Sequence, residues 1–174
     1  MKRALLMIAF ISIGVITASA RQAQFDGEKE FQQLVRLAGH WEGTYEWSGA
    51  RTGKGEVIAD YSLTGFGSAL VESLIQGGKP SMMSVYHLDG NDLRVTHYCA
   101  ARNQPRLIAD KVDAASGQVD FKFVDITNLK SPESGHVSGI SLRSLSDKHI
   151  NLIFRFIGNG KESTEVMDLW RRKT

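Results

Sequence analysis

Apolar and polar residues alternate along most of this chain after residue 39. Clusters of Gly, Asn, Asp and Ser interrupt the alternation roughly every dozen residues. Successive side chains of a strand point to opposite faces, so a period of two is typical of strands with one buried face and one wet face. The connections are too short for crossover helices, so neighbouring strands must run antiparallel.

Ten segments fit this pattern. They span residues 40–47, 53–64, 68–76, 82–88, 93–100, 106–113, 118–126, 136–145, 149–157 and 162–172. An open sheet of this size would have two exposed edges, whereas closure removes both of them. The sequence therefore predicts an all-β fold, an antiparallel up-and-down β-barrel of about ten strands.

One helix is expected before the strands. Apolar residues recur at helical spacing from Phe31 to Ala38, and Asp26 is a suitable N-cap. We predict a helix over residues 27–38 that Gly39 ends. No repeat or linker divides the chain further, so residues 21–174 are expected to form a single domain.

The N-terminus has the features of a secretory signal peptide over residues 1–20. Basic Lys2 and Arg3 precede an apolar run, and Ala18-Ser19-Ala20 is a small-residue cleavage site. The alternative is a retained membrane anchor, but the apolar run is shorter than the roughly 18 to 20 residues that span a bilayer. We expect cleavage near Ala20, export to a periplasm or beyond, and no stable membrane anchor afterwards.

Charge and cysteine content limit the partners. The chain has 21 Lys and Arg against 19 Asp and Glu, and two of the basic residues lie in the predicted signal peptide. The remaining chain is balanced in charge, so we expect no nucleic-acid partner. Cys99 is the single cysteine, so no disulfide forms within the chain.

Two motifs carry a family resemblance. Gly39-His40-Trp41 opens the first predicted strand, and Trp170-Arg171-Arg172 lies in the last. This resembles the calycin pattern of lipocalins and fatty-acid-binding proteins, in which a basic side chain of the closing strand packs on a Gly-x-Trp of the first. Ten strands favour the fatty-acid-binding or nitrobindin-like variant, although the helix pair that lids a fatty-acid-binding barrel is missing here.

A second resemblance covers most of the chain after the predicted signal peptide. The segment from Thr96 to Arg106, together with Thr127-Asn128-Leu129 and Gly135-His136, is similar to a group of uncharacterised exported bacterial proteins with lipocalin-like barrels. This resemblance implies the barrel fold and brings no established activity, so no catalytic role follows from it.

The hairpin around residues 89–92 predicts part of the barrel interior. Pairing Leu88 with Leu93 fixes every other pair, because residue numbers across an antiparallel ladder sum to a constant. One face of the hairpin then holds the leucines and no formal charge apart from an imidazole, so it should face inward. The predicted lumen residues are Met82, Ser84, Tyr86, Val95, His97 and Cys99, with Ser84 opposite His97 and Met82 opposite Cys99.

Residues after this hairpin are expected near the barrel opening. Pro105 cannot donate to a ladder and predicts a loop over residues 102–106. There Arg102 or Arg106 would orient a carboxylate or phosphate, and amides would donate to it. The connection from Asn128 to His136 is the longest and would fold over the same opening. The residues predicted at the opening are Asn103, Arg106, Asn128 and His136, with Gln104 as a further amide donor.

We predict an exported binding protein that holds a small, largely apolar ligand with one polar end in the lumen, because a ten-strand barrel is wide enough to leave space. An alternative is an enzyme acting on a small molecule, with His97 as general base. A haem-binding, nitrobindin-like barrel with His97 or His136 as the iron ligand is another. The remaining alternative is a scaffold or interaction barrel whose lumen is filled by its own side chains.

His97 and Cys99 also raise two chemical alternatives. With His136 they would supply three ligands to a soft metal, but no CxxC or HxxxH pair supports this, and we predict no metal and no cofactor. As nucleophile and base, their Cβ atoms would be about 6.5 to 7 Å apart along the strand, and an apolar lumen disfavours the thiolate. We therefore assign no catalytic residue.

Overall fold

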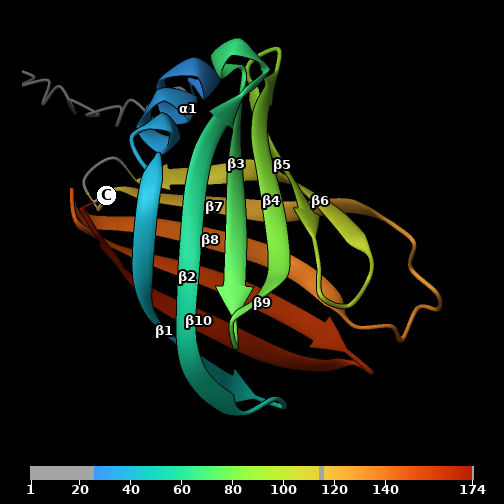
Figure 1. Ribbon diagram of the computed structural model, residues 1–174. Helices are drawn as coiled ribbons and strands as arrows, with labels where there is room; N and C mark the ends of the chain where they lie inside the picture. Colours follow the sequence, from blue (N-terminus) through green and yellow to red (C-terminus); the bar gives the residue numbers. More distant parts are fainter. Residues whose placement is uncertain (1–25, 114–115, 174) are drawn as a thin grey trace, which may run out of the picture.

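The computed structural model describes residues 26–113 and 116–173, so the predicted signal peptide and its cleavage site lie outside the described residues. Ten strands follow one helix, α1 (Gly27–Val35), as Figure 1 shows. The strands are β1 (Gly39–Gly49), β2 (Gly53–Thr64), β3 (Ala69–Gln76), β4 (Lys79–Asp89), β5 (Asp92–Tyr98), β6 (Gln104–Asp113), β7 (Gln118–Thr127), β8 (His136–Ser146), β9 (His149–Gly158) and β10 (Lys161–Arg171). A 3₁₀ turn, η1 (Gly65–Gly67), joins β2 to β3.

The strands form one closed barrel, in which each strand pairs with its neighbours in sequence and β1 pairs with β10. Every neighbouring pair is antiparallel. The predicted all-β, ten-stranded, up-and-down barrel with one short N-terminal helix is therefore confirmed. The largest shift is at β4, which begins at Lys79, because Gly77 and Gly78 with positive φ complete a two-residue hairpin turn.

The predicted loop over residues 102–106 is wrong in its second half, because β6 begins at Gln104 and Pro105 is a buried strand residue. Pro105 pairs with Ile126 of β7, while the ladder between β6 and β5 begins only at Arg106. Pro105 lacks an N–H, but no hydrogen bond of the ladder with β5 is lost, because that ladder does not include Pro105. Proline is tolerated in a strand at positions that are unpaired on one side.

The helix is also shorter than predicted. Asp26 is the N-cap and accepts a hydrogen bond from the N–H of Lys29, as expected, but α1 ends at Val35 and not at Gly39. The next residues bond three positions back, with the N–H of Leu37 donating to Leu34 O. The Leu37 carbonyl then accepts a 2.8 Å hydrogen bond from the Trp41 indole, which fixes this turn.

The first and last strands are joined around Trp41, which is fully buried. The guanidinium of Arg171 from β10 lies 4.3 Å from the Trp41 ring centroid and donates to the carbonyls of Ala38 and Arg36. Gly39 has φ 136°, and a Cβ there would lie 2.8 Å from Arg171 Nη1. The predicted packing of a basic closing-strand residue on the Gly-x-Trp motif is therefore confirmed.

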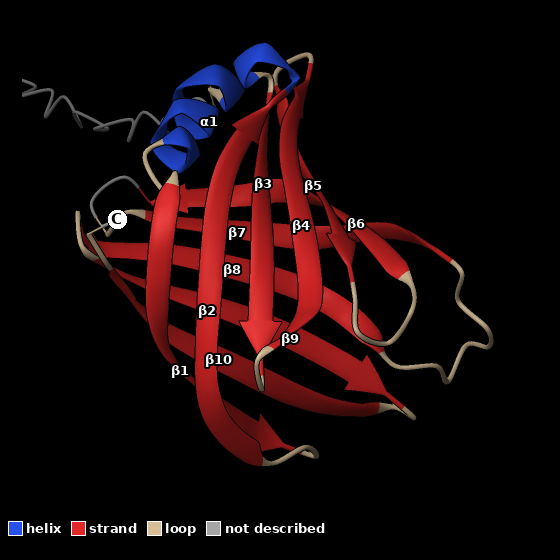
Figure 2. Cartoon of the chain, viewed as in Figure 1, coloured by secondary structure: helices blue, strands red, loops and turns tan. Residues whose placement is uncertain are grey.

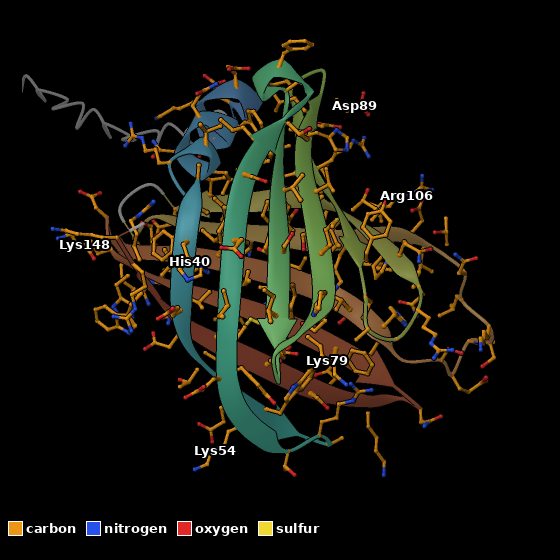
Figure 3. The ribbon with its side chains drawn as sticks, in the orientation of Figure 1. His40, Lys54, Lys79, Asp89, Arg106 and Lys148 are labelled. Carbon is orange, nitrogen blue, oxygen red and sulfur yellow. The ribbon has the colours of Figure 1, made fainter. Side chains whose placement is uncertain are left out.

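The two ends of the barrel differ. Helix α1 and η1 lie at one end, near the β4–β5 turn marked by Asp89 in Figure 3, and the short turns near Lys54 and Lys79 lie at the other. Figure 2 shows only strands and loops at this second end, which we call the open end. Within residues 26–113 and 116–173, no helix is long and apolar enough to cross a membrane.

Candidate functional site

The predicted register of the β4–β5 hairpin is confirmed, with Leu88 opposite Leu93, Tyr86 opposite Val95 and Ser84 opposite His97. Ser84, Tyr86, Val95 and His97 are all buried in the barrel interior. The ladder ends at Met83 and Tyr98, so Met82 and Cys99 follow it as half-buried residues one step closer to the open end. The structure therefore brings the predicted lumen residues together on one inward face.

Four buried polar residues lie side by side on the inner face of the barrel, one on each strand from β2 to β5. Tyr61 lies opposite Glu72, Glu72 opposite Ser84, and Ser84 opposite His97 on successive strands. We call Tyr61, Glu72, Ser84 and His97 the inner rung. Glu72 Oε2 accepts hydrogen bonds from Tyr61 (2.8 Å) and from Tyr86 (3.0 Å), and Oε1 accepts one from Ser84 (2.9 Å).

His97 ends the inner rung. Its Nδ1 lies 2.9 Å from Ser84 Oγ, and because Ser84 donates its proton to Glu72, we assign the imidazole proton to Nδ1. Burial lowers the pKa of His97 from 6.5 to about 4, so the ring is neutral at neutral pH. Nε2 is buried without a partner among the described residues, and the ring packs on Phe154 with centroids 4.8 Å apart.

Burial raises the pKa of Glu72, against the opposing effect of its three hydrogen bonds. Burial also raises the pKa values of Tyr61 and Tyr86 well above their ordinary value, so both phenols stay protonated and donate. Both oxygens of the Glu72 carboxyl thus accept hydrogen bonds from side chains of the protein itself. Such a network fixes side-chain positions in the core.

The lumen opens into a cavity of about 550 Å³ at the open end. Its apolar wall includes Tyr45, Trp47, Met82, Val137, Phe154 and Phe156. Its polar side chains are Arg51, Thr52, Gln76, Cys99 and Glu165. Mostly apolar walls with a few polar groups are typical of a small-molecule site, and the volume falls within the usual range for such sites.

A second row of inward residues borders this cavity. Trp47 of β1 lies opposite Glu165 of β10, and Glu165 lies opposite Phe154 of β9. We call Trp47, Glu165 and Phe154 the outer rung. The ladder register thus places one carboxyl between two aromatic side chains, and Glu165 is only 1% exposed.

The Glu165 carboxyl is only partly bonded. Gln76 of β3, three strands away around the barrel, donates a 2.8 Å hydrogen bond to Oε1. Oε2 is buried and has no hydrogen-bond partner of normal geometry among the described residues. Burial raises the pKa of Glu165, and hydrogen bonding by Gln76 and by the Trp47 indole, together with the charge of Arg51, offsets part of that rise. Glu165 therefore lines the cavity as a buried carboxyl with one oxygen bonded to Gln76 and one oxygen without a hydrogen bond of normal geometry.

Arg51 forms the rim of the cavity and is exposed. Its guanidinium lies 3.7 Å from the centroid of the Phe156 ring and 5.3 Å from that of Trp47. These distances are those of cation–π contacts. The aromatic wall at the rim thus already accommodates one cationic group.

The four residues predicted at the opening do not line the cavity. Asn103 is buried and donates to the Gly135 carbonyl at 2.9 Å, which ties the β5–β6 loop to the β7–β8 connection. Asn128 is exposed and donates to Gln104 Oε1. Arg106 is exposed, and its Nη2 donates to Asp125 Oδ2 at 2.7 Å, so its side chain points away from the lumen.

His136, the fourth of them, precedes the inward Val137, and its ring packs on exposed Phe123 with centroids 5.4 Å apart. Neither His136 nor His97 lines the cavity, so the residues present do not offer an imidazole to a haem placed there. Among the described residues, no three His, Cys, Asp or Glu side chains lie together as a metal site.

Cys99 lines the cavity and is half-buried. Its sulfur accepts a long contact of 3.5 Å from the N–H of Ala101. Burial raises the pKa of the thiol, which keeps it in the less nucleophilic form.

A second cavity, of about 520 Å³, lies at the opposite end between α1 and the ends of β6, β7, β8 and β10. Its apolar wall includes Leu34, Leu37, Trp41 and Leu142. None of the buried polar atoms without a partner lies among the residues that line it. Charged side chains, among them Lys29, Glu30 and Arg36, also line this cavity.

The sequence reasoning missed Glu72 and Glu165, although a signal for each was present. Glu72 lies between Leu70 and Leu74 in the alternation of β3, and Glu165 continues the alternation of Met167 in β10. A charged residue in the apolar half of a period-two pattern is predicted to face inward. Applying that rule to every strand identifies both glutamates.

Two solved structures share the fold. A protein of unknown function from the DUF3598 family of Nostoc punctiforme aligns with a TM-score of 0.54 and 12% identity, over 80% of this chain and 49% of that one. Rv2717c from M. tuberculosis aligns with a TM-score of 0.56 and 16% identity, over 83% and 98% of the two chains. The chain spans about half the length of the first protein, and the similarity is one of fold.

No protein-family model matches the chain, and a search of curated proteins finds no match. The structural similarity shows that solved proteins share the fold of this closed barrel of ten antiparallel strands.

Proposed function

We propose that the protein is an exported binding protein that holds a small, largely apolar molecule in the cavity at the open end. The observation that carries this proposal is the cavity of about 550 Å³, whose aromatic and aliphatic wall includes the buried Glu165 carboxyl, one oxygen of which has no hydrogen bond of normal geometry. A buried acceptor without a donor costs about 1 to 3 kcal/mol, and a ligand that supplies the donor removes that cost. The inner rung, by contrast, supplies its own donors to its carboxyl.

Binding can be tested with Prodan, an uncharged naphthalene dye with one carbonyl whose fluorescence rises in an apolar site. Val137→Phe places a larger side chain in the open-end cavity, and we expect it to raise the Kd for Prodan at least about tenfold. Val119→Phe is the matched control, because Val119 is similarly buried but lines the cavity at the α1 end. We expect it to leave the Kd unchanged.

Thermal unfolding of both variants is measured first, since a larger core side chain typically costs about 1 to 3 kcal/mol. Absence of saturable wild-type binding both of Prodan and of naphthalene compounds that carry an N–H or O–H donor would contradict the proposal. A loss of binding in Val119→Phe but not in Val137→Phe would move the site to the α1 end.

The export part of the proposal rests on Lys2 and Arg3, the apolar run and the Ala18-Ser19-Ala20 site. The intact mass of the protein isolated from its source organism tests it. We expect a chain that begins at Arg21, and a mass that includes residues 1–20 would contradict cleavage.

A further inference from the structure

We propose that the ligand of the open-end cavity carries an ammonium group, and that this group donates to Glu165 Oε2 while the apolar part of the ligand packs between Trp47 and Phe154. This inference rests on the proposed function and names the chemical class of the ligand. The relevant molecules are primary or secondary amines on a compact apolar body.

The first argument is the chemistry of the orphan atom. An ionised carboxylate only accepts hydrogen bonds, and Oε2 of Glu165 has no hydrogen bond of normal geometry, although the Trp47 indole lies near the carboxyl. Oε1 already accepts from Gln76, so the carboxyl is held in place before a ligand arrives. A cationic N–H donor is the strongest partner for a buried carboxylate, because it supplies charge as well as a hydrogen bond.

The second argument is the pair of aromatic neighbours. The ladder places Trp47 and Phe154 on either side of Glu165, and Phe156 adds a third ring to the same wall. Aromatic faces attract cations and also pack against hydrocarbon. The Arg51 guanidinium 3.7 Å from the Phe156 centroid demonstrates that this wall accepts a cation.

The third argument concerns an anionic ligand. Arg51 is the single Lys or Arg among the residues lining the cavity, and it is exposed at the rim. A ligand carboxylate would have to reach the interior beside Glu165, where two like charges repel. An anion therefore fits the rim but not the buried part of the cavity, whereas an ammonium group fits the buried part.

Proton release provides an independent sign of an ammonium ligand. Burial raises the pKa of Glu165. A bound ammonium group favours the ionised form and lowers that pKa, so any proton that the carboxyl holds in the free protein is released on binding. Binding enthalpies measured in two buffers with different ionisation enthalpies report the number of protons released.

The test compares three ligands with the same body: 1-naphthylmethylamine, 1-naphthalenemethanol and 1-naphthoic acid. Their Kd values are measured by calorimetry at pH 7 for the wild type and for Glu165→Gln, which keeps an acceptor for Gln76. Glu162→Gln is the matched control, because Glu162 is an exposed glutamate of the same strand.

We expect the wild type to bind the amine about tenfold or more tightly than the alcohol and the acid. Glu165→Gln should remove that preference while keeping the affinity for the alcohol, which also shows that the variant is folded. Glu162→Gln should behave as the wild type does.

An amine preference that survives Glu165→Gln, or a wild type that binds the alcohol or acid as tightly as the amine, would overturn the assignment of the ligand class. In the second case, weaker binding of the alcohol by Val137→Phe would leave the proposed binding function intact. If Prodan and all three naphthalenes fail to bind the wild type, the proposed function itself fails.

Discussion

Glu72 and Glu165 are two glutamates in the same barrel, both buried and both facing the lumen, yet they have opposite surroundings. Glu72 accepts hydrogen bonds from Tyr61, Ser84 and Tyr86. Glu165 accepts one from Gln76, lines a cavity, and has no hydrogen bond of normal geometry at its other oxygen. The difference teaches that a buried carboxyl is fully bonded where neighbouring strands supply donors, and is left partly unbonded where a cavity takes their place.

The largest contrast is expected from replacing each glutamate by leucine. Glu72→Leu leaves three hydroxyl groups in the core without their acceptor, and we expect it to lower the free energy of unfolding by about 3 to 5 kcal/mol. Glu165→Leu removes a poorly compensated buried carboxyl, so we expect a change of at most about 1 kcal/mol. Chemical denaturation of both variants at pH 7 measures this contrast, and equal losses would remove the distinction between the two rungs.

The next largest effect is the pH dependence of the inner rung. His97 has a folded pKa of about 4, below the value of 6.5 expected in the unfolded chain, so the unfolded state takes up the proton first as pH falls. Stability attributable to His97 should therefore fall by about 3 kcal/mol between pH 6.5 and pH 4. Denaturation at several pH values measures the slope, from which His97→Leu should remove the His97 contribution and leave that of other groups such as Glu72, whereas His136→Asn should keep the His97 contribution.

A His97→Leu variant with the same slope as the wild type would show that His97 is not the buried neutral base of the inner rung.

The outer rung should give a smaller slope of opposite sign. The folded pKa of Glu165 is raised, so the folded state holds its proton more tightly than the unfolded chain. Stability attributable to Glu165 therefore falls as pH rises from about 4.5 through the folded pKa. The free energy of unfolding of the wild type minus that of Glu165→Gln, measured across the same pH series, isolates this slope. If that difference rises with pH, the fold stabilises the carboxyl in its ionised form, which would contradict the prediction.

The smallest effect is expected outside the barrel. Arg106 pairs with Asp125 on the exposed face of β6 and β7, and exposed ion pairs contribute little to stability. We expect Arg106→Gln to leave both the stability and the Kd for Prodan unchanged. A clear loss of Prodan affinity would place Arg106 in the binding site, as the sequence alone suggested.

The local parts of the structure were predictable from the sequence. Alternation and turn clusters located all ten strands, and one hairpin turn was enough to place His97 opposite Ser84, because the two strands are adjacent in sequence. The end of α1 was not predictable in the same way, since it depends on the Trp41 indole reaching the Leu37 carbonyl.

The cavity was less predictable, because the outer rung combines strands from opposite ends of the chain. The pairing of Trp47 with Glu165 depends on barrel closure between β1 and β10, and its register cannot be counted across a turn. Gln76 reaches Glu165 through the lumen without any ladder contact. By contrast, the sequence analysis placed Arg106, at the end of the segment from Thr96 to Arg106, near the barrel opening. In the structure its side chain faces outward.

Methyl NMR during a Prodan titration tests the central claim most directly, namely that the open end binds and the remaining interior stabilises. We predict saturable shifts of the Val137 and Met82 methyl signals, because both side chains line the open-end cavity, and constant signals from Val119 and Leu142 at the α1 end. Saturable shifts at Val119 and Leu142 with unchanged signals from Val137 and Met82 would contradict the account.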